Sequence, residues 1–516
     1  MLKIAGGTLD INYNNSASDN TARNNIVHRK IIELSNGGTI VNDAMATTRG
    51  ICTLLVADSG TIRGTKRIDI RSQGEDPDCT ATTVTGDDNA VLNFNNPEAA
   101  IYNATVNIGR INVLGGKTRI EANGTHNIKN GIHVADGAAL GYWNSASSAG
   151  AAVCVDTGTA QIQAESGTST MNGPLNVEAG ATAQLAGGAT LNYTGGIQNA
   201  GTVKVTSGTH KIKSAVNENA DLQITGGALY LCDGMSAQNV TITASGGSNG
   251  LMVESATPPI FDTFTVNATA GAFDLIPRVA GTIVDIPGPI VVNHSGDGNC
   301  YVYGPTNNVE YGLAVKLTGT FSRIGIGNTA TRSGTLELKD GSDVTVKNLY
   351  TGDWGSSPAR GRLIIDNGAT VTVTENIRNG HWSGTPADAS THAIEISGTL
   401  DAAGLITYNS YDSPRGEMLL KEGGILKTRG FNTRKNYAYG SGMGAGDGRQ
   451  WFTMEGGRLE LGDYGFNGYT IPGVTKYDFQ NGTVINTSSA WGGTQGFPLF
   501  FGYDKVGGKV TFDMDQ

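Results

Sequence analysis

Two consecutive segments decide the fold, GTLELKDGSDVTVKNLYTG (residues 334–352) and GRLIIDNGATVTVTENIRNG (residues 361–380). They align at an offset of 27 residues, which becomes 28 after a one-residue insertion. Within the first segment Leu336 and Leu338 are separated by a polar residue, and this alternation has the period of a half-buried β-strand. The Asp340-Gly341 pair that follows is a strong turn signal, since Gly accepts a positive φ. Each segment therefore predicts two short strands joined by a turn.

One such unit buries too few side chains to be stable alone. Stacked on its copies, it shares a continuous apolar interior and pairs its backbone with the next coil. We therefore expect the matching apolar residues of the two segments to point inward in stacked rows, namely Leu336, Leu338, Val344, Val346, Leu363, Ile365, Val371 and Val373.

The repeat extends through the chain with a changing period. Related units open at Gly416, Gly456, Gly482 and Gly508, whereas Gly residues between 158 and 227 recur at steps of about 20. No sustained helical periodicity is found, so the fold class expected is all-β, a parallel β-solenoid of about 20 coils of roughly 25 residues. We divide it into four regions: 1–255 with 20–22-residue coils, 256–320 with distorted coils holding six prolines, 321–430 with the repeats quoted above, and 431–516 with aromatic-rich coils that look truncated.

Composition excludes several other classes. The 516 residues include 75 Gly but only 14 Pro, and charged residues make up 16 %, against about 25 % in typical proteins. Disordered chains are usually rich in Pro and charged residues, so this composition is the reverse of theirs. The sequence also lacks the Gly-X-Y period of collagen. The net charge is −10, whereas nucleic-acid binders usually carry an excess of basic residues, so no nucleic-acid partner is expected. No apolar run approaches the ~20 residues of a membrane helix, so no membrane insertion is expected.

Both ends of the chain read as cuts through a repeat. Residues 1–11 already resemble a repeat strand, and residues 508–514 resemble another. Because an uncapped solenoid end exposes unpaired strand edges, we expect either a larger protein or self-association along or at the ends of the rod.

The units within 324–380 resemble the β-strand repeats of bacterial autotransporter-type surface proteins. The shared pattern is G-T-L-x-L, then G, V-T-V and N-L-Y-x-G, as it stands in residues 334–352. This resemblance implies a right-handed parallel β-helix, export across the envelope and a passenger role at the cell surface. It implies no catalytic residues. The function expected is a non-enzymatic extracellular structural or adhesive solenoid.

Parallel β-helices also include polysaccharide-cleaving enzymes, which form the alternative. Gly86-Asp87-Asp88 resembles the central G-D-D of polygalacturonases, where carboxylates act as acid and base. The accompanying Asn-Thr-Asp, Gly-His-Gly and Arg-Ile-Lys motifs are missing, so we interpret Asp87 and Asp88 as an exposed turn. No catalytic or cofactor-binding residue is predicted. The alternative is a polysaccharide-binding or polysaccharide-cleaving β-helix, with surface glycans as partners. A cleft with three convergent carboxylates or a Lys/Arg–carboxylate set would favour the enzyme, whereas a featureless polar groove or chain-to-chain packing along the rod would favour the structural protein.

Metal sites are left open, with calcium as the alternative to solvated loop carboxylates. Gly296-Asp297-Gly298-Asn299 is too short to bind calcium alone. The calcium candidates cluster within 14 residues: Glu75, Asp76, Asp78, Asp87 and Asp88.

The cysteines form no CxxC pair, which argues against zinc and redox motifs. Cys52 and Cys79 lie 27 residues apart, about one repeat, so they could stack on adjacent coils and bridge. We expect the others, Cys154, Cys232 and Cys300, to be buried apolar side chains.

Aromatic residues gather between 431 and 516. They would either fill wider coils or form platforms for sugar rings or a partner surface. The residues concerned are Tyr437, Tyr439, Trp451, Tyr464, Tyr469 and Trp491.

Overall fold

The structure is a computed structural model of the whole chain. It describes residues 1–10, 31–43, 50–71, 81–121, 125–143, 150–217, 219–296, 298–306, 309–327, 332–352, 361–379, 393–408, 418–432, 451–454, 456–467, 476–479 and 484–487.

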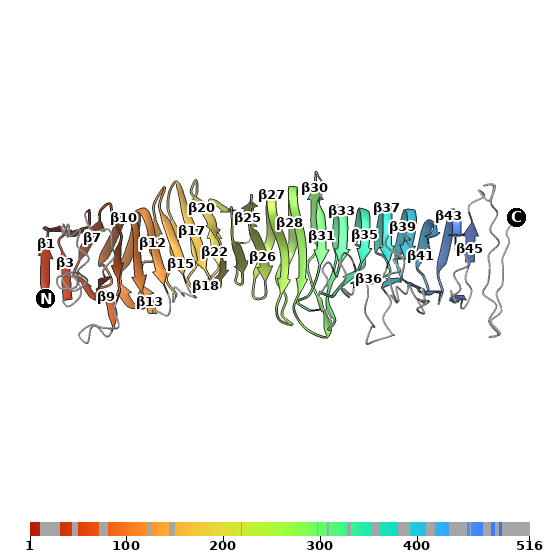
Figure 1. Cartoon of the computed structure of the whole chain (residues 1–516), viewed down its shortest axis with the longest axis horizontal. Helices are drawn as coiled ribbons and strands as arrows, with labels where there is room; N and C mark the ends of the chain where they lie inside the picture. The colour runs from red at the N-terminus through yellow and green to blue at the C-terminus, as the bar shows by residue number, and fades with distance from the viewer. Residues whose placement is uncertain are drawn as a thin grey trace, which may run out of the picture. The chain divides into compact units, whose positions relative to one another are not determined.

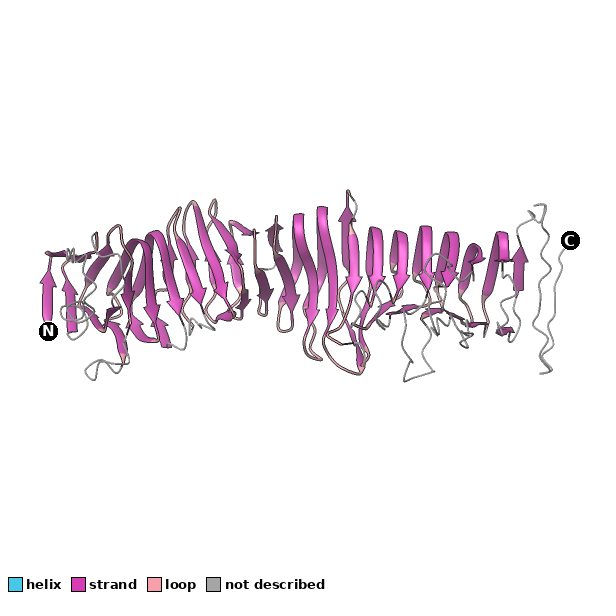
Figure 2. Ribbon diagram, in the orientation of Figure 1, coloured by secondary structure: helices cyan, strands magenta, loops and turns pink. Residues whose placement is uncertain are grey.

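The described residues form strands, turns and loops, and no helix occurs among them (Figure 2). Each strand pairs in parallel with a strand one turn further along the chain. Examples are β1 (Leu2–Ala5) with β3 (Ile31–Ser35), and β34 (Gly334–Leu338) with β36 (Gly361–Ile365). Figure 1 shows these strands following one another side by side within each part of the chain. The expected fold class, an all-β parallel β-solenoid, is therefore confirmed. The chain divides into two compact units, 1–243 and 244–516, which are described separately.

The first unit is built from two parallel sheets. The shorter has six strands: β1 (Leu2–Ala5), β3 (Ile31–Ser35), β6 (Thr53–Val56), β9 (Thr82–Gly86), β11 (Ala104–Ile108) and β13 (Thr125–Ile128). The longer contains β2 (Thr8–Asp10), β4 (Gly38–Val41), β5 (Gly50–Ile51), β7 (Ser59–Arg63), β8 (Ile68–Ile70), β10 (Val91–Tyr102), β12 (Arg110–Glu121), β14 (Ile132–Val134), β15 (Ala139–Trp143), β16 (Val153–Val155), β17 (Thr159–Ser166), β18 (Thr168–Met171), β19 (Leu175–Val177), β20 (Thr182–Gly187), β21 (Thr190–Tyr193), β22 (Ile197–Asn199), β23 (Thr202–Val205), β24 (Thr209–Ile212), β25 (Asn219–Ile224) and β26 (Ala228–Cys232). Strand β27 (Ser236–Val253) contains the boundary between the units.

The second unit is also built from two parallel sheets. One has eight strands: β29 (Thr282–Asp285), β32 (Tyr311–Val315), β34 (Gly334–Leu338), β36 (Gly361–Ile365), β38 (Ile394–Ile396), β40 (Met418–Leu420), β42 (Trp451–Met454) and β44 (Lys476–Phe479). The other contains β28 (Ile260–Pro277), β30 (Ile290–His294), β31 (Asn299–Val302), β33 (Leu317–Ile326), β35 (Asp343–Thr351), β37 (Thr370–Asn379), β39 (Thr399–Tyr408), β41 (Ile425–Asn432), β43 (Arg458–Asn467) and β45 (Val484–Thr487).

The number of turns differs somewhat from the expectation. The six-stranded and eight-stranded sheets together mark about 14 turns, fewer than the about 20 coils expected from the sequence. Turns between residues 132 and 232 have no strand in either of these two sheets, because their strands pair within the longer sheet.

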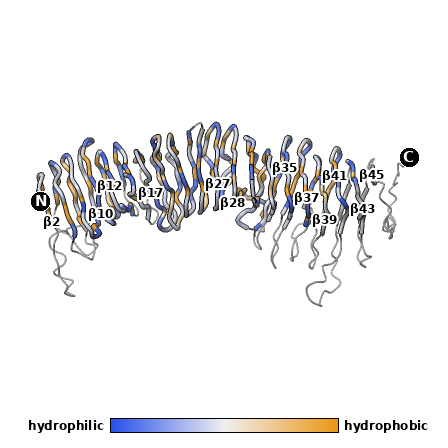
Figure 3. Tube along the Cα trace, turned by 90° about the horizontal axis from the view of Figure 1, so that it is seen from above, coloured by the Kyte–Doolittle hydropathy of each residue, from blue (hydrophilic) through white to orange (hydrophobic). Residues whose placement is uncertain are grey.

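The inward rows predicted from the repeat are confirmed. Leu336 pairs with Leu363 and Leu338 with Ile365 between β34 and β36. Val344 pairs with Val371 and Val346 with Val373 between β35 and β37. All eight side chains are at most 1 % exposed. Figure 3 shows the same principle along successive coils, where apolar orange stretches alternate with polar blue ones.

A shorter period occurs in part of the first unit, whereas nearer the start of the chain the paired residues Leu2 and Ile32 lie 30 positions apart. Between residues 175 and 212 each turn carries three strands, and β19, β20 and β21 pair with β22, β23 and β24. The paired residues Leu175 and Ile197 lie 22 positions apart, whereas Thr190 and Thr209 lie 19 apart. The predicted turn glycines also behave as expected, because Gly341 and Gly368 have φ values of 74° and 83°.

No helix in the described part of the chain is long and apolar enough to cross a membrane.

Candidate functional site

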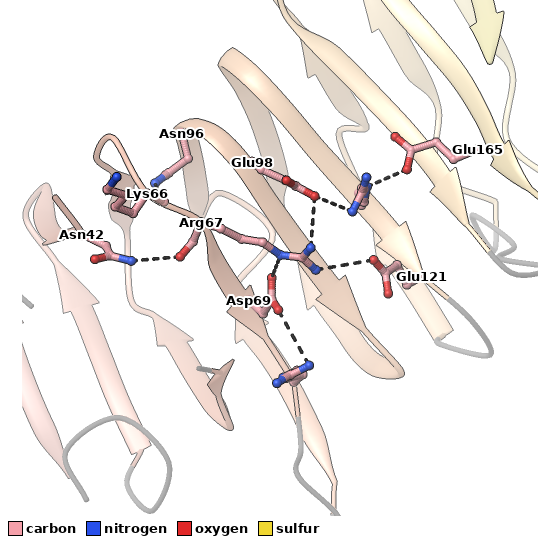
Figure 4. A network of polar contacts seen from close by, with 10 residues as sticks. Asn42, Lys66, Arg67, Asp69, Asn96, Glu98, Glu121 and Glu165 are labelled. Carbon is pink, nitrogen blue, oxygen red and sulfur yellow. Dashed lines mark hydrogen bonds and ion pairs between the residues drawn. The ribbon is translucent and has the colours of Figure 1, made fainter. Parts of the chain in front are cut away.

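A cluster of four carboxylates and four cations lies on one side of the first unit (Figure 4). It spans strands β8, β10 and β12, which lie on successive turns, and β17, which is separated from β12 by β15. We call it the ion cluster; its members are Arg67, Asp69, Arg71, Glu98, Lys117, Arg119, Glu121 and Glu165.

Arg67 lies between three of the carboxylates. Its Nε donates a hydrogen bond to Asp69 Oδ1 at 2.7 Å, and its Nη1 donates to Glu98 Oε1 at 3.1 Å. Its Nη2 lies 3.8 Å from Glu121 Oε1. The side chain of Asp69 is fully buried, and that of Glu121 is 3 % exposed. A single guanidinium therefore joins carboxylates from three turns, a role suited to its fork of donors.

Arg119 forms the second centre of the ion cluster. It is paired with Glu98, and its Nε lies 2.5 Å from Glu165 Oε2. Lys117 Nζ reaches Glu165 Oε1 at 2.8 Å. The guanidinium also lies over the ring of Trp143, 4.8 Å from its centroid, which is a cation–π contact.

Small residues in the sheet make room for these long side chains. Ala100 pairs with Asp69 on one side and with Arg119 on the other. Gly141 pairs with Arg119 on the next turn, and a Cβ at Gly141 would lie 2.8 Å from Glu165 Oε1. The side chains of Arg119 and Glu165 occupy the space that the glycine leaves free.

Burial and ion pairing have opposite effects on the pKa values of the charged groups in the cluster. Burial raises the pKa of Glu121, while the hydrogen bond from Tyr102 and the charge of Arg67 oppose that rise. The hydrogen bond to Glu121 also raises the pKa of the Tyr102 hydroxyl. For Arg67, burial tends to lower the pKa, but the hydrogen bond to Asp69 and the charges of Asp69, Glu98 and Glu121 together outweigh it, so the net change is upward.

The sequence contains a pattern that indicates this cluster, although the pattern is not a catalytic or metal-binding motif. Charged residues occur at every second position in Arg67-Ile68-Asp69-Ile70-Arg71 and again in Lys117-Thr118-Arg119-Ile120-Glu121. In a strand this spacing places them on one face. The sequence does not show which residues of successive turns lie side by side, because the spacing varies. Arg67 and Glu98 lie 31 residues apart, whereas Glu98 and its strand partner Lys117 lie only 19 apart.

The second unit carries a smaller group of the same kind. Glu395 is 8 % exposed and accepts bonds from Arg362 Nη2 at 2.5 Å and Lys421 Nζ at 2.8 Å. Arg362 also donates to Glu310 Oε1 at 2.9 Å, and Glu310 in turn accepts from the Thr335 hydroxyl. Burial tends to raise the pKa of Glu395, but the bonds from Lys421 and Arg362 lower it overall.

A carboxyl pair lies on the same sheet. Glu337 and Asp366 share a hydrogen bond, and the pKa of each is raised, chiefly by burial. A hydrogen bond between two carboxyl groups needs one of them protonated. The pair can therefore keep one proton at a pH above the usual pKa of a carboxylic acid.

The two aspartates singled out in the sequence lie in an exposed turn, as predicted. They connect β9 to β10, where Asp87 Oδ1 accepts a bond from the Asn89 backbone N–H at 2.9 Å. Asp88 is paired with Lys129, and its side chain is 69 % exposed. The other calcium candidates, Glu75, Asp76 and Asp78, lie outside the described residues, as does Asp297.

The cysteines and the C-terminal aromatics are only partly described. Cys52 is disulfide-bonded, and Cys79, its predicted partner, lies outside the described residues. Cys232 and Cys300 are buried free thiols, as expected, whereas Cys154 is only partly buried. Of the six aromatic candidates, Trp451 and Tyr464 belong to strands β42 and β43, and the others lie outside the described residues: Tyr437, Tyr439, Tyr469 and Trp491.

The chain matches no family model, no curated protein and no solved structure. The fold and the two charged groups therefore carry the functional argument by themselves.

Proposed function

We propose that this chain is a non-enzymatic structural or adhesive β-solenoid, exported and displayed at a cell surface as part of an autotransporter-like protein. The observation that carries the proposal is that the charged side chains bridge successive turns. Arg67 joins residues of three strands in the first unit, and Arg362 joins Glu310 and Glu395 in the second.

Such bridging suits a mechanical role better than a catalytic one. Backbone ladders and inward rows already hold each turn to the next, and the ion pairs add a lateral connection on the outer side. A guanidinium stays protonated in proteins, so Arg67 and Arg119 would not serve as bases. Their charges also neutralise the carboxylates that a glycosidase would use as acid and nucleophile.

The location is tested by labelling intact cells of the source organism with an antibody against the chain. We expect labelling without permeabilisation, with an antibody against a cytoplasmic protein as the negative control. Labelling that appears only after permeabilisation would overturn the proposed export. Sedimentation of the purified chain over a range of concentrations tests the proposed self-association, which predicts a sedimentation coefficient that rises with concentration.

A second candidate function is the binding or cleavage of surface polysaccharides. It is favoured by the ion cluster, which is a Lys/Arg–carboxylate set of the kind expected of the alternative. It is also favoured by the Glu337–Asp366 pair, since the general acid of a glycosidase is a carboxyl group whose pKa lies above the usual value. The purified chain is incubated with a panel of neutral and acidic polysaccharides, and reducing ends and unsaturated products are measured. The structural proposal predicts no turnover. Turnover that is lost in Glu337→Gln, but kept in the exposed-turn variant Asp88→Asn, would establish the enzyme instead.

A further inference from the structure

A third group of side chains, apart from the ion cluster, lies on the outer face of strands β14 and β16. His133 in β14 and Cys154 in β16 are direct partners in the parallel ladder. Their neighbours Ile132, Val134, Val153 and Val155 are at most 1 % exposed, so the alternation turns His133 and Cys154 outward. Asp156 follows Cys154 by two positions and is exposed.

The three side chains converge on a small volume. His133 Nδ1 lies 2.6 Å from Asp156 Oδ2. One ligand atom from each of His133, Cys154 and Asp156 lies within 4.8 Å of the others. Tetrahedral zinc, with ligands at about 2.0–2.3 Å, needs its ligand atoms about 3.3–3.7 Å apart. Modest rotations of the three side chains would bring them to that spacing.

The surrounding contacts orient these groups in the way that metal ligands require. His133 Nε2 lies 3.0 Å from the backbone oxygen of Asn130, which only accepts hydrogen bonds, so Nε2 carries a hydrogen. A metal ion would replace the hydrogen that Nδ1 donates to Asp156 in the 2.6 Å contact, and the lone pair of Nδ1 then faces Asp156 and Cys154. A ligating histidine typically donates its other N–H to a backbone carbonyl or a carboxylate in this manner. Asn176 Nδ2 donates to Cys154 Sγ at 3.7 Å.

We propose that His133, Cys154 and Asp156 bind a divalent transition-metal ion of the zinc type, with at least one coordination position left open. A thiolate and a carboxylate neutralise the two charges of the ion, and the imidazole adds a neutral nitrogen. Sulfur and nitrogen ligands suit zinc, whereas calcium and magnesium take oxygen ligands. Metal binding releases to solvent the protons that the ligand atoms carry without metal.

The test uses Co²⁺ as a spectroscopic probe and Zn²⁺ as its competitor on the full chain, purified without chelator. Binding at this site predicts a near-ultraviolet thiolate-to-Co²⁺ charge-transfer band, visible bands of tetrahedral Co²⁺, and one ion per chain, displaced by Zn²⁺. Loss of a ligand in Cys154→Ser should weaken Zn²⁺ binding by more than the about 10- to 100-fold that loss of an outer-shell partner costs. It should also abolish the charge-transfer band.

Gln198→Ser is the matched control, because Gln198 continues the same outer row beyond Asn176 and contributes no ligand. It should bind Co²⁺ like the parent chain. His133→Gln keeps the thiol, serves if Cys154→Ser fails to fold, and should lose the tetrahedral spectrum. A chain that shows no charge-transfer band, or a Cys154→Ser variant that binds Zn²⁺ as tightly as the parent, overturns the proposal.

Discussion

Replacement of Leu338 by alanine probes the inward rows of the second unit. Leu338 is 1 % exposed and pairs with Val315 on one side and Ile365 on the other. The row continues through Ile396 to Leu420, and both of these are fully buried. The substitution therefore opens a gap inside a column whose members are held in register by the backbone ladder.

The magnitude follows from what is removed and from how well the gap can close. Leucine loses three carbon atoms, worth about 2.4 kcal/mol at about 0.8 kcal/mol for each buried methylene. The residues above and below are tied to their own strands, so little collapse is expected, and the cavity adds to the transfer loss. We expect a loss of about 4 kcal/mol, within the range of known buried Leu-to-Ala changes. Leu338→Asp should cost still more, because it buries an unpaired charge.

Hydrogen exchange is the suitable assay, because a solenoid can unfold turn by turn rather than as one unit. Leu338→Ala should accelerate exchange in β32, β34 and β36 while leaving the first unit unchanged. Thr345→Ala is the control, since Thr345 lies on the outer face of β35 in the same turn, and it should cost less than about 1 kcal/mol. Equal effects of the two substitutions would refute the proposed inward register.

Two further predictions concern buried polar groups. Burial lowers the pKa of His210 from 6.5 to about 4, so the unfolded chain binds an extra proton and stability should fall by about 3 kcal/mol as pH drops from about 6.5 to about 4. His210 Nδ1 lies 2.9 Å from the Tyr193 hydroxyl, and the glutamine of His210→Gln can still accept a hydrogen bond from that hydroxyl. Urea titrations at several pH values should show this pH dependence in the parent chain and its loss in His210→Gln; the same dependence in both would contradict the prediction. Arg67→Met removes the shared partner of buried carboxylates and should cost about 3 kcal/mol at neutral pH, but less near pH 4, where the raised pKa of Glu121 favours its neutral form. Thermal melts of the parent chain and the variant at both pH values measure this loss of stability. A loss that does not change with pH would contradict the proposal that the variant leaves buried carboxylates unpaired.

Local repetition in the sequence was enough to predict the class of fold and the orientation of many side chains. The 27-residue offset placed Leu336 over Leu363 and Val344 over Val371, as the strand register has them. This succeeds because period-2 alternation and turn glycines act over a few residues, and because each copy must repeat the same inward face for the interior to be continuous. The exposed turn at Asp87 was predictable for the same local reason.

The lateral neighbours on the outer surface were decided by tertiary structure alone. Which side chains meet there depends on the length of each turn, and a change of one residue turns a strand's side chains to the other face. The offset of 21 positions from His133 to Cys154 places a histidine directly beside a thiol, a relation that no CxxC or His-Glu-x-x-His spacing indicates. The offset of 31 positions from Arg67 to Glu98 is likewise a length that no repeat predicts. The sequence determines an inward row because every copy encodes it, whereas an outward constellation occurs once and arises only when the turns are stacked.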